Sequence, residues 1–139
     1  MRILLANKFY YPRGGDCIYT IELEKLLRSK GHEVAAFSMH HGSNLGSEYA
    51  EYFPSNVDFN KRNIKSLTSL LVRPFGSLEV RRKFNRLIRD FRPDIIHLNN
   101  IHSQLSPVLA LIGHRKNVPV VWTLHDYKLV CPAYLLLNQ

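Results

Sequence analysis

Polar and ionisable side chains follow each of four apolar runs in this sequence of 139 residues. Such groups can hydrogen-bond a polar ligand and transfer protons near neutral pH. Each one alone is better explained as an ordinary polar loop residue, but their recurrence after all four runs predicts a shared site. In chain order they are Asn7, Lys8, His40, His41, Asn99, Asn100, His102, His125 and Asp126.

A second candidate site is the stretch YYPRGGD, residues 10–16, which separates the first apolar run from a helical pattern. Gly14 and Gly15 would lie where free backbone N–H groups and the helix dipole attract an anion. Glycine also permits positive φ and lets a phosphate approach the backbone closely. A plain turn with Asp16 as the N-cap accounts for the same residues equally well, so the stretch indicates a phosphate site without requiring one.

Two common kinds of bound group are disfavoured. The G-x-G-x-x-G pattern of dinucleotide-binding domains is missing, and the second apolar run ends in Ser38 and Met39 instead of an acidic residue that would bind a ribose. The seven histidines include no H-x-x-x-H motif and no carboxylate pairing at ligand spacing on one helix face. We therefore expect neither a cofactor nor a metal ion.

The elements that must position these residues alternate between strand and helix. The predicted strands are 2–6, 33–38, 94–99 and 119–124, and the predicted helices are 16–30, 77–91, 104–115 and a less regular 61–73. The strands are nearly continuous apolar runs, as strands buried on both faces tend to be. This order predicts an α/β fold with a Rossmann-like, doubly wound parallel sheet. Ligands of such sheets bind beyond the carboxyl ends of the strands, which is where the polar residues would gather.

Helical spacing also predicts which faces are buried. In helix 16–30 the apolar stripe is Tyr19, Leu23, Leu26 and Leu27, and Gly31 stands where a left-handed cap residue belongs. In helix 77–91 the apolar face is Val80, Phe84, Leu87, Ile88 and Phe91, the basic face is Arg82, Arg86 and Arg89, and Pro93 marks the end. Residues 40–60 have no period and are expected to form a surface excursion.

The composition is typical of a single cationic domain. The length and a hydrophobic content of 45% fit one globular unit, and a formal charge of +8 favours phosphate-bearing partners. No apolar run is long enough to span a membrane and the N-terminus does not resemble a secretory signal, so we expect a cytoplasmic location. Cys17 and Cys131 are expected to be free thiols.

Two basic surfaces of the predicted structure could bind phosphate-bearing partners. The arginine face of helix 77–91 has no aromatic side chains interleaved with the charge, so we expect a solvated face and no nucleic-acid binding. Residues 61–75 place Ile64, Leu67 and Leu71 at helical spacing among basic residues, which is typical of a helix lying on an anionic membrane surface. Ordinary core packing explains this segment slightly better, and peripheral membrane contact stays open.

Four blocks of the sequence resemble one family. They are ILLANKFYYPRGGD, YTIELEKLLRSKGHEVAAFSM, FRPDIIHLNNIHSQLSP and VPVVWTLHDYKLVCP. In order and spacing they closely resemble the N-terminal domain of the family 4 retaining glycosyltransferases, which have the GT-B fold. The resemblance extends over nearly the whole chain.

The resemblance implies that residues 1–139 form the acceptor-side, Rossmann-like half of an enzyme with two such domains facing across a cleft. The C-terminal half, which holds most of the nucleotide-sugar donor and a glutamate pair in an E-x7-E pattern, is absent from the sequence. Gly14 and Gly15 would approach the donor diphosphate, and His125, with Asp126 beside it, would act near the transferred sugar. The expected acceptor-binding residues are Arg13, Asn99, Asn100, His102 and Tyr127.

Two positions depart from the family's pattern. Asp16 and Cys17 stand where many relatives have a small residue and a glutamate, so no role of that glutamate carries over. In the third strand, the common H-x-H is replaced by His97, Leu98 and Asn99. His97 is expected to be a buried structural residue.

The sequence thus predicts the N-terminal domain of a retaining, hexosyl-type glycosyltransferase. It would move a sugar from a nucleotide-sugar donor to a glycan or lipid-linked acceptor in envelope or capsular polysaccharide synthesis. The enzyme would lie in the cytoplasm or at the inner membrane face, and the isolated fragment is expected to be inactive. The alternative is a non-catalytic saccharide- or nucleotide-binding module, or an inactive truncated product.

Overall fold

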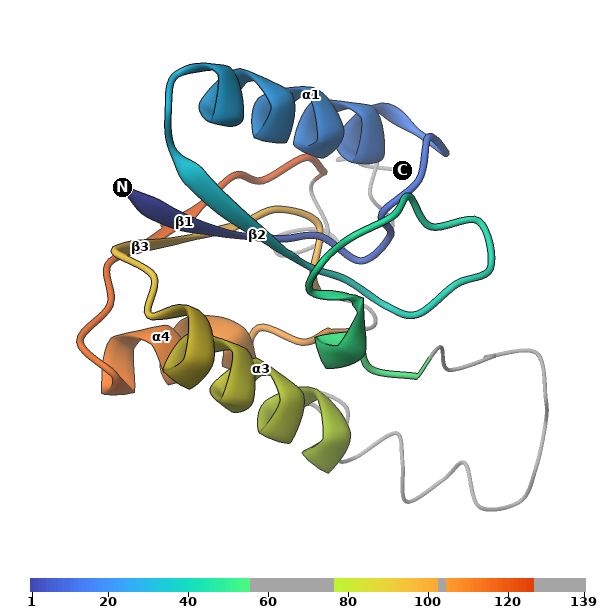
Figure 1. Ribbon diagram of the computed structural model, residues 1–139. Coiled ribbons are helices and arrows are strands. Elements are labelled where there is room, and N and C mark those ends of the chain that lie inside the picture. The colour runs from blue at the N-terminus through green and yellow to red at the C-terminus, as the bar shows by residue number, and fades with distance from the viewer. Residues whose placement is uncertain (56–76, 103–104, 127–139) are drawn as a thin grey trace, which may run out of the picture.

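A parallel four-stranded sheet with helices on both faces forms the framework of the protein. The computed structural model describes residues 1–55, 77–102 and 105–126. Helix α1 covers one face of the sheet, and α3 and α4 cover the other (Figure 1). This arrangement confirms the predicted α/β, Rossmann-like, doubly wound fold. The elements are β1 (Arg2–Ala6), α1 (Gly15–Ser29), β2 (Glu33–Phe37), η1 (Ala50–Tyr52), α3 (Leu78–Phe91), β3 (Ile95–Leu98), α4 (Val108–Arg115) and β4 (Val120–Trp122).

The strand order β2-β1-β3-β4 creates a reversal in the middle of the sheet. The chain moves from β1 to one side to form β2, and then returns past β1 to form β3 and β4. All three pairings are parallel, with Ala6 opposite Phe37 on β2 and opposite Leu98 on β3. The carboxyl ends of all four strands therefore share one edge, and the point between β1 and β3 is the topological switch point at which such sheets bind ligands.

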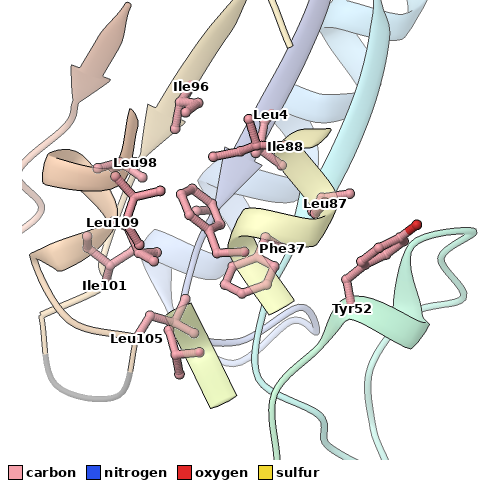
Figure 2. Packing of buried hydrophobic residues seen from close by; sticks show 14 of the residues in the cluster. Leu4, Phe37, Tyr52, Leu87, Ile88, Ile96, Leu98, Ile101, Leu105 and Leu109 are labelled. Atoms are coloured by element: carbon pink, nitrogen blue, oxygen red, sulfur yellow. The ribbon is translucent and has the colours of Figure 1, made fainter. Parts of the chain in front are cut away.

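The main core lies between the sheet and the helices α3 and α4. Figure 2 shows Leu4, Phe37 and Ile96 of the strands packed with Leu87 and Leu109 of the two helices. The buried face of α3 is the one that helical spacing predicts, Val80, Phe84, Leu87, Ile88 and Phe91. The arginines of the predicted basic face, Arg82, Arg86 and Arg89, are exposed. The hydroxyl of Ser77 caps this helix by accepting from Val80 N at 3.1 Å.

The predicted stripe of α1 is wrong in part. Tyr19 and Leu26 are 41% and 54% exposed, although Leu23 and Leu27 do pack against the sheet. The buried residues are Cys17, Thr20, Ile21 and Glu24, which share a face because they follow helical spacing. The sequence pattern did not predict this face, because it includes the polar residues Thr20 and Glu24. The cap is as predicted, since Gly31 has φ of 80°.

Other element boundaries also differ from expectation. Strands β3 and β4 are shorter than predicted, but Asp94 N donates to Arg2 O and Thr123 N donates to Leu98 O, so the pairing extends beyond their ends. Helix α4 begins at Val108 instead of 104, because Ser106 has φ of 82° and breaks the helical path immediately before Pro107.

The expected surface excursion after β2 is partly a core element. Its short helix η1 buries Tyr52, and Phe53 directly after it is also buried. Figure 2 shows Tyr52 extending from η1 beside α3, where its hydroxyl donates to Asp90 at 3.1 Å. The predicted helix 61–73, Tyr127 and Cys131 lie outside the described residues. None of the described helices is long and apolar enough to cross a membrane.

Candidate functional site

Asn7 and Asn100 tie the strand ends together at the switch point. The backbone N–H of Asn100 donates to Asn7 Oδ1 at 3.1 Å, and Lys8 N donates to Asn100 O at 3.1 Å. Asn7 Nδ2 also donates to the carbonyl of Phe9 at 3.0 Å. Both asparagines are buried. The loops after β1 and β3 are therefore fixed relative to each other at the edge where a ligand would bind.

The glycine pair lies at the N-terminus of α1. Gly14 is the N-cap residue and its carbonyl accepts from Cys17 N and Ile18 N, while no side chain caps the helix. The alternative with Asp16 as N-cap is therefore wrong. Gly14 has φ of −159° and Gly15 is helical, so neither needs the positive φ that glycine permits. As in any helix, the first N–H groups of α1 have no intrahelical acceptor.

Packing within the described structure does not require glycine at position 15. A Cβ added to Gly15 would meet no described atom within 4 Å, and a Cβ on Gly14 would meet only Asp16 Oδ1 at an ordinary 3.4 Å. By contrast, a Cβ on Gly113 would lie 2.6 Å from Val120 Cγ2. Gly113 thus allows a helix to approach a strand, whereas no described atom occupies the space beside Gly15.

Asp16 brings a carboxylate to the same place. Its Oδ2 accepts from Asn100 Nδ2 at 3.0 Å, which joins the first turn of α1 to the loop after β3. The Oδ1 atom of Asn100 is buried and has no hydrogen-bond partner within the described ranges. A carboxylate beside an unpaired amide oxygen can accept hydrogen bonds from ligand hydroxyl groups. Sequence reasoning had considered Asp16 only as a cap.

His125 is held by residues from two other elements. Its Nε2 lies 3.1 Å from Asn99 Oδ1, and because an amide oxygen only accepts, Nε2 carries the proton and a neutral ring presents Nδ1 as an acceptor. The ring of Tyr19 on α1 meets His125 edge to face, with centroids 5.0 Å apart. Tyr19 was assigned to the core by the sequence, and the structure brings it to the site instead.

Asn99 is fully buried beneath His125. Its backbone N–H donates to Ala6 O at 2.9 Å, and its carbonyl accepts from Trp122 Nε1 at 2.9 Å. The side-chain Nδ2 atom has no partner among the residues that the structure describes. The amide is thus fixed in position, with a buried Nδ2 atom that no described group satisfies.

His102 and Asp126 form a second pair, between the loops that follow β3 and β4. His102 Nε2 lies 3.1 Å from Asp126 Oδ1 and 3.3 Å from Oδ2, so Nε2 donates to the carboxylate. The His102 side chain is 5% exposed, and its Nδ1 is buried without a hydrogen-bond partner in the described part of the chain. Two predicted site residues are therefore brought into direct contact.

His97 connects β3 to the residue that follows β4. Its Nε2 lies 2.8 Å from Thr123 Oγ1, and burial, aided by the nearby charge of His125, lowers the pKa of His97 below its ordinary value. These contacts fit the structural role expected for His97. Arg13, predicted to bind acceptor, lies against the ring of Phe9, and Tyr127 lies outside the described residues.

The titratable groups do not converge on a common point. Among the described residues, no group of three or more His, Cys, Asp or Glu side chains could hold a metal ion. Cys17 is buried and unbridged, and burial raises the pKa of its thiol. The edge instead carries imidazoles, amides and carboxylates in separate pairs beside a helix N-terminus, and groups of these kinds can bind hydroxyl and phosphate groups.

Comparison with known proteins gives a matching family profile, and the matches include a curated protein and a solved structure. The profile of Glycosyltransferase Family 4 matches residues 13–136. An uncharacterized 42.6 kDa protein in a cps region of Klebsiella pneumoniae is 31% identical over 144 residues, which cover 95% of this chain and 38% of that protein. The crystal structure of SsfS6, a Streptomyces glycosyltransferase, matches with a TM-score of 0.47 and 17% identity over 91% of this chain and 40% of its own. The chain thus spans well under half the length of both.

Proposed function

The chain belongs to glycosyltransferase family 4, and we propose from this that it forms the acceptor-side domain of a retaining GT-B glycosyltransferase. The proposed enzyme transfers a hexosyl group from a nucleotide-sugar donor to a hydroxyl group of a glycan or lipid-linked acceptor. In this proposal a second, C-terminal domain holds most of the donor, and the 139 residues contribute one wall of the active site.

The observation that carries this proposal is the placement of the glycine pair. Gly14 and Gly15 begin α1 beside the switch point, where Asn7 and Asn100 fix the loops. Free N–H groups and the helix dipole there can stabilise the charge that develops on a leaving diphosphate. Since the described residues leave space beside Gly15, close approach of a phosphate would explain glycine there.

The residues after β3 and β4 receive complementary roles. We assign His125 to the transferred sugar, because its Nδ1 can accept from a sugar hydroxyl while Asn99 holds Nε2. Asp126 is engaged by His102, so we assign it a positioning role for the loop that carries His125. Asn99, Asn100 and His102 keep unpaired polar atoms within the described ranges, and we assign these to acceptor or sugar hydroxyl groups.

The proposed chemistry needs neither a metal nor a cofactor. The bond between the anomeric carbon and the donor phosphate oxygen breaks, and the acceptor oxygen bonds to the same face of that carbon. The acceptor proton passes to the leaving diphosphate. The protein accelerates this step by holding both oxygens on one face and by stabilising the diphosphate electrostatically.

The biological setting follows from one relative and from charge. The Klebsiella pneumoniae relative is described by its place in a cps region, which supports a role in capsular or envelope polysaccharide synthesis. The formal charge of +8 favours anionic partners such as nucleotide sugars and an anionic membrane surface. We therefore place the enzyme in the cytoplasm or peripherally at the inner membrane face.

A transfer assay tests the proposed function. The complete gene product is incubated with UDP- and GDP-hexoses and a mixture of envelope oligosaccharides and lipid-linked saccharides, with EDTA present. We expect a glycosylated product with retained anomeric configuration. If nucleotide sugars or saccharides bind but no sugar is transferred with or without divalent metal, the binding-module alternative is favoured.

A further inference from the structure

The ring of Phe9, just beyond the carboxyl end of β1, contacts two cations. The guanidinium carbon of Arg13 lies 4.5 Å from the centroid of the Phe9 ring, and Lys8 Nζ lies 5.8 Å from it. The ring itself is buried, whereas Arg13 is exposed and Lys8 is half-buried. Attraction between each cation and the negative face of the ring keeps both positive charges at this point.

These charges are not neutralised by the described part of the protein. Lys8 and Arg13 form no ion pair with any described residue, although six other basic side chains do. Those six are Arg2, Lys25, Arg28, Lys83, Arg86 and Arg89. The carboxylate of Asp16, close in sequence, is engaged by Asn100 on the other side of the loop. A positive potential therefore remains available to a ligand.

Tyr11 and His41 form an aromatic stack beside Phe9, in which each ring covers one face of the other and a ligand can meet only an outer face. Their rings are stacked, with centroids 4.7 Å apart and an angle of 18°, and Tyr11 also contacts Phe9 at 5.5 Å. Tyr11 lies in the loop after β1 and His41 in the loop after β2, and both are half-buried. An aromatic face of this kind can pack against the C–H face of a pyranose ring, because both surfaces are apolar.

We propose that Lys8, Phe9, Tyr11, Arg13 and His41 form a subsite for an acidic sugar unit of the acceptor. The pyranose ring would lie on an outer face of the Tyr11–His41 stack, and its carboxylate or phosphate would bind Lys8 and Arg13. The inference rests on the proposed glycosyltransferase function and adds to it the chemical class of the acceptor. The same cations could bind the donor diphosphate, and the test below separates these two sources of anion.

The position of the subsite fits an extended acceptor. The subsite follows β1 and β2, whereas His125 follows β4, which lies two places from β1 in the sheet. Neighbouring strands are about 4.8 Å apart, so the ends of β1 and β4 are roughly 10 Å apart. The acidic unit would therefore lie beside the reacting hydroxyl and not on it.

The test compares two ligands that differ by one carboxylate. Methyl glucoside and methyl glucuronide are titrated into the chain at low salt, and dissociation constants are taken from amide chemical shifts. We expect the glucuronide to bind about tenfold more tightly, and salt to reduce this ratio because exposed charges are screened. Lys8→Gln with Arg13→Gln should bring the ratio near one, whereas Tyr11→Ala should weaken both sugars by a similar factor and keep the ratio.

A matched control removes the same charges elsewhere. Lys30 ends α1 and Arg115 ends α4, away from the carboxyl edge of the sheet, and both are exposed. Lys30→Gln with Arg115→Gln should keep the tenfold ratio. Circular dichroism and urea unfolding establish that each variant is folded before its ratio is compared. Equal binding of the two glycosides by the parent chain, or no binding of either, overturns the proposal.

Titrations with inorganic pyrophosphate and UDP-glucose show whether the cations bind an acidic acceptor sugar or the donor diphosphate. If the Lys8 and Arg13 substitutions weaken pyrophosphate more than glucuronide, or if Tyr11→Ala leaves glucuronide binding unchanged, the cluster binds donor phosphate and the proposal is wrong. If methyl glucoside and methyl glucuronide have equal dissociation constants while UDP-glucose binds normally, the subsite is contradicted and the proposed function is not. A retained ratio without UDP-glucose binding contradicts the proposed function alone.

Discussion

Asn100 donates its backbone N–H to the side chain of Asn7 at 3.1 Å, across the point where the strand order reverses. The same Asn100 donates Nδ2 to Asp16 on the first turn of α1. Asn100, a single residue in the loop after β3, thus connects the end of β1 to the start of α1. The geometry of the glycine loop depends on this connection, because the loop runs from Asn7 to Gly15.

The first prediction concerns the stability of this connection. Asn7→Ala removes the acceptor of Asn100 N and the donor to Phe9 O in a buried place, and leaving buried backbone groups unpaired is costly. We expect a loss of about 2–3 kcal/mol in the free energy of unfolding, measured by urea denaturation with an unchanged m-value. The control, Asn85→Ala on the half-buried side of α3, should change it by less than about 1 kcal/mol. Equal losses in the free energy of unfolding for the two substitutions would show that the hydrogen bonds of Asn7 do not stabilise the fold.

The second prediction concerns the reason for glycine at position 15, which is either packing within the protein or close approach of a ligand. Gly15→Ala places a methyl group where no described atom lies within 4 Å, so stability should stay the same or rise by about 0.5–1 kcal/mol. Binding of pyrophosphate should weaken by about tenfold or more, because the methyl group occupies the path to the N–H groups. Calorimetry and urea unfolding measure the two effects.

Gly113→Ala is the opposite control. Its methyl group would lie 2.6 Å from Val120 Cγ2, and such overpacking costs about 1–3 kcal/mol. Pyrophosphate affinity of the folded fraction should be unchanged. If Gly15→Ala lowers stability as much as Gly113→Ala, position 15 is a packing glycine and the anion site is wrong.

The third prediction concerns pH. Burial lowers the pKa of His97 below its ordinary value of 6.5, so between these two values the unfolded chain binds more protons than the folded one. The contribution of His97 to stability is therefore fully present above pH 6.5 and is lost as the pH falls through that window to the folded pKa. An NMR titration of the His97 imidazole should give a midpoint below 6.5. His125→Asn should raise this midpoint, because it removes the nearby charge of His125. A midpoint at or above 6.5 would contradict the described environment of His97.

The fourth prediction concerns turnover. In the complete gene product, His125→Ala should lower kcat by roughly 10²-fold, the scale of one well-placed polar group in a transition state. Asn99→Ala should lower kcat less, since it acts by holding Nε2 of His125. His114→Ala, at an exposed position near the end of α4, should leave kcat unchanged. Near-normal turnover of the His125 variant would remove that residue from the site.

The sequence predicted the fold well where one face of an element is uniformly apolar. Helix α3 is such a case, since the residues at helical spacing in the sequence are the ones that are buried. Helix α1 is not, because it buries Glu24. This carboxylate is stabilised by the Tyr10 hydroxyl at 2.7 Å and by Arg28, and its proximity, together with burial, raises the pKa of Tyr10. Such a network joins residues from a loop and a helix, and no local pattern shows it.

The candidate site was predictable in position but not in its pairings. Parallel strands place Asn99, Asn100 and His125 at one edge whatever their contacts, so topology alone was sufficient to gather them. Which groups meet depends on loop paths, as in the contact between His102 and Asp126. Tyr19 was missed for a related reason, because an aromatic residue in a helix suggests the core unless the neighbouring loop is known.

The central claim is that nucleotide-sugar phosphate binds at the switch point, and an amide-resolved titration of the 139-residue chain with UDP-glucose and GDP-mannose tests it most directly. We expect weak binding, on the order of millimolar or about −4 kcal/mol, because most donor contacts would come from another domain. Chemical-shift changes should be confined to the amides of residues 7–16, 99–102 and 123–126, and Gly15→Ala should abolish them. Shift changes centred on α3 or on the opposite edge of the sheet, or micromolar binding by the chain alone, would contradict the account.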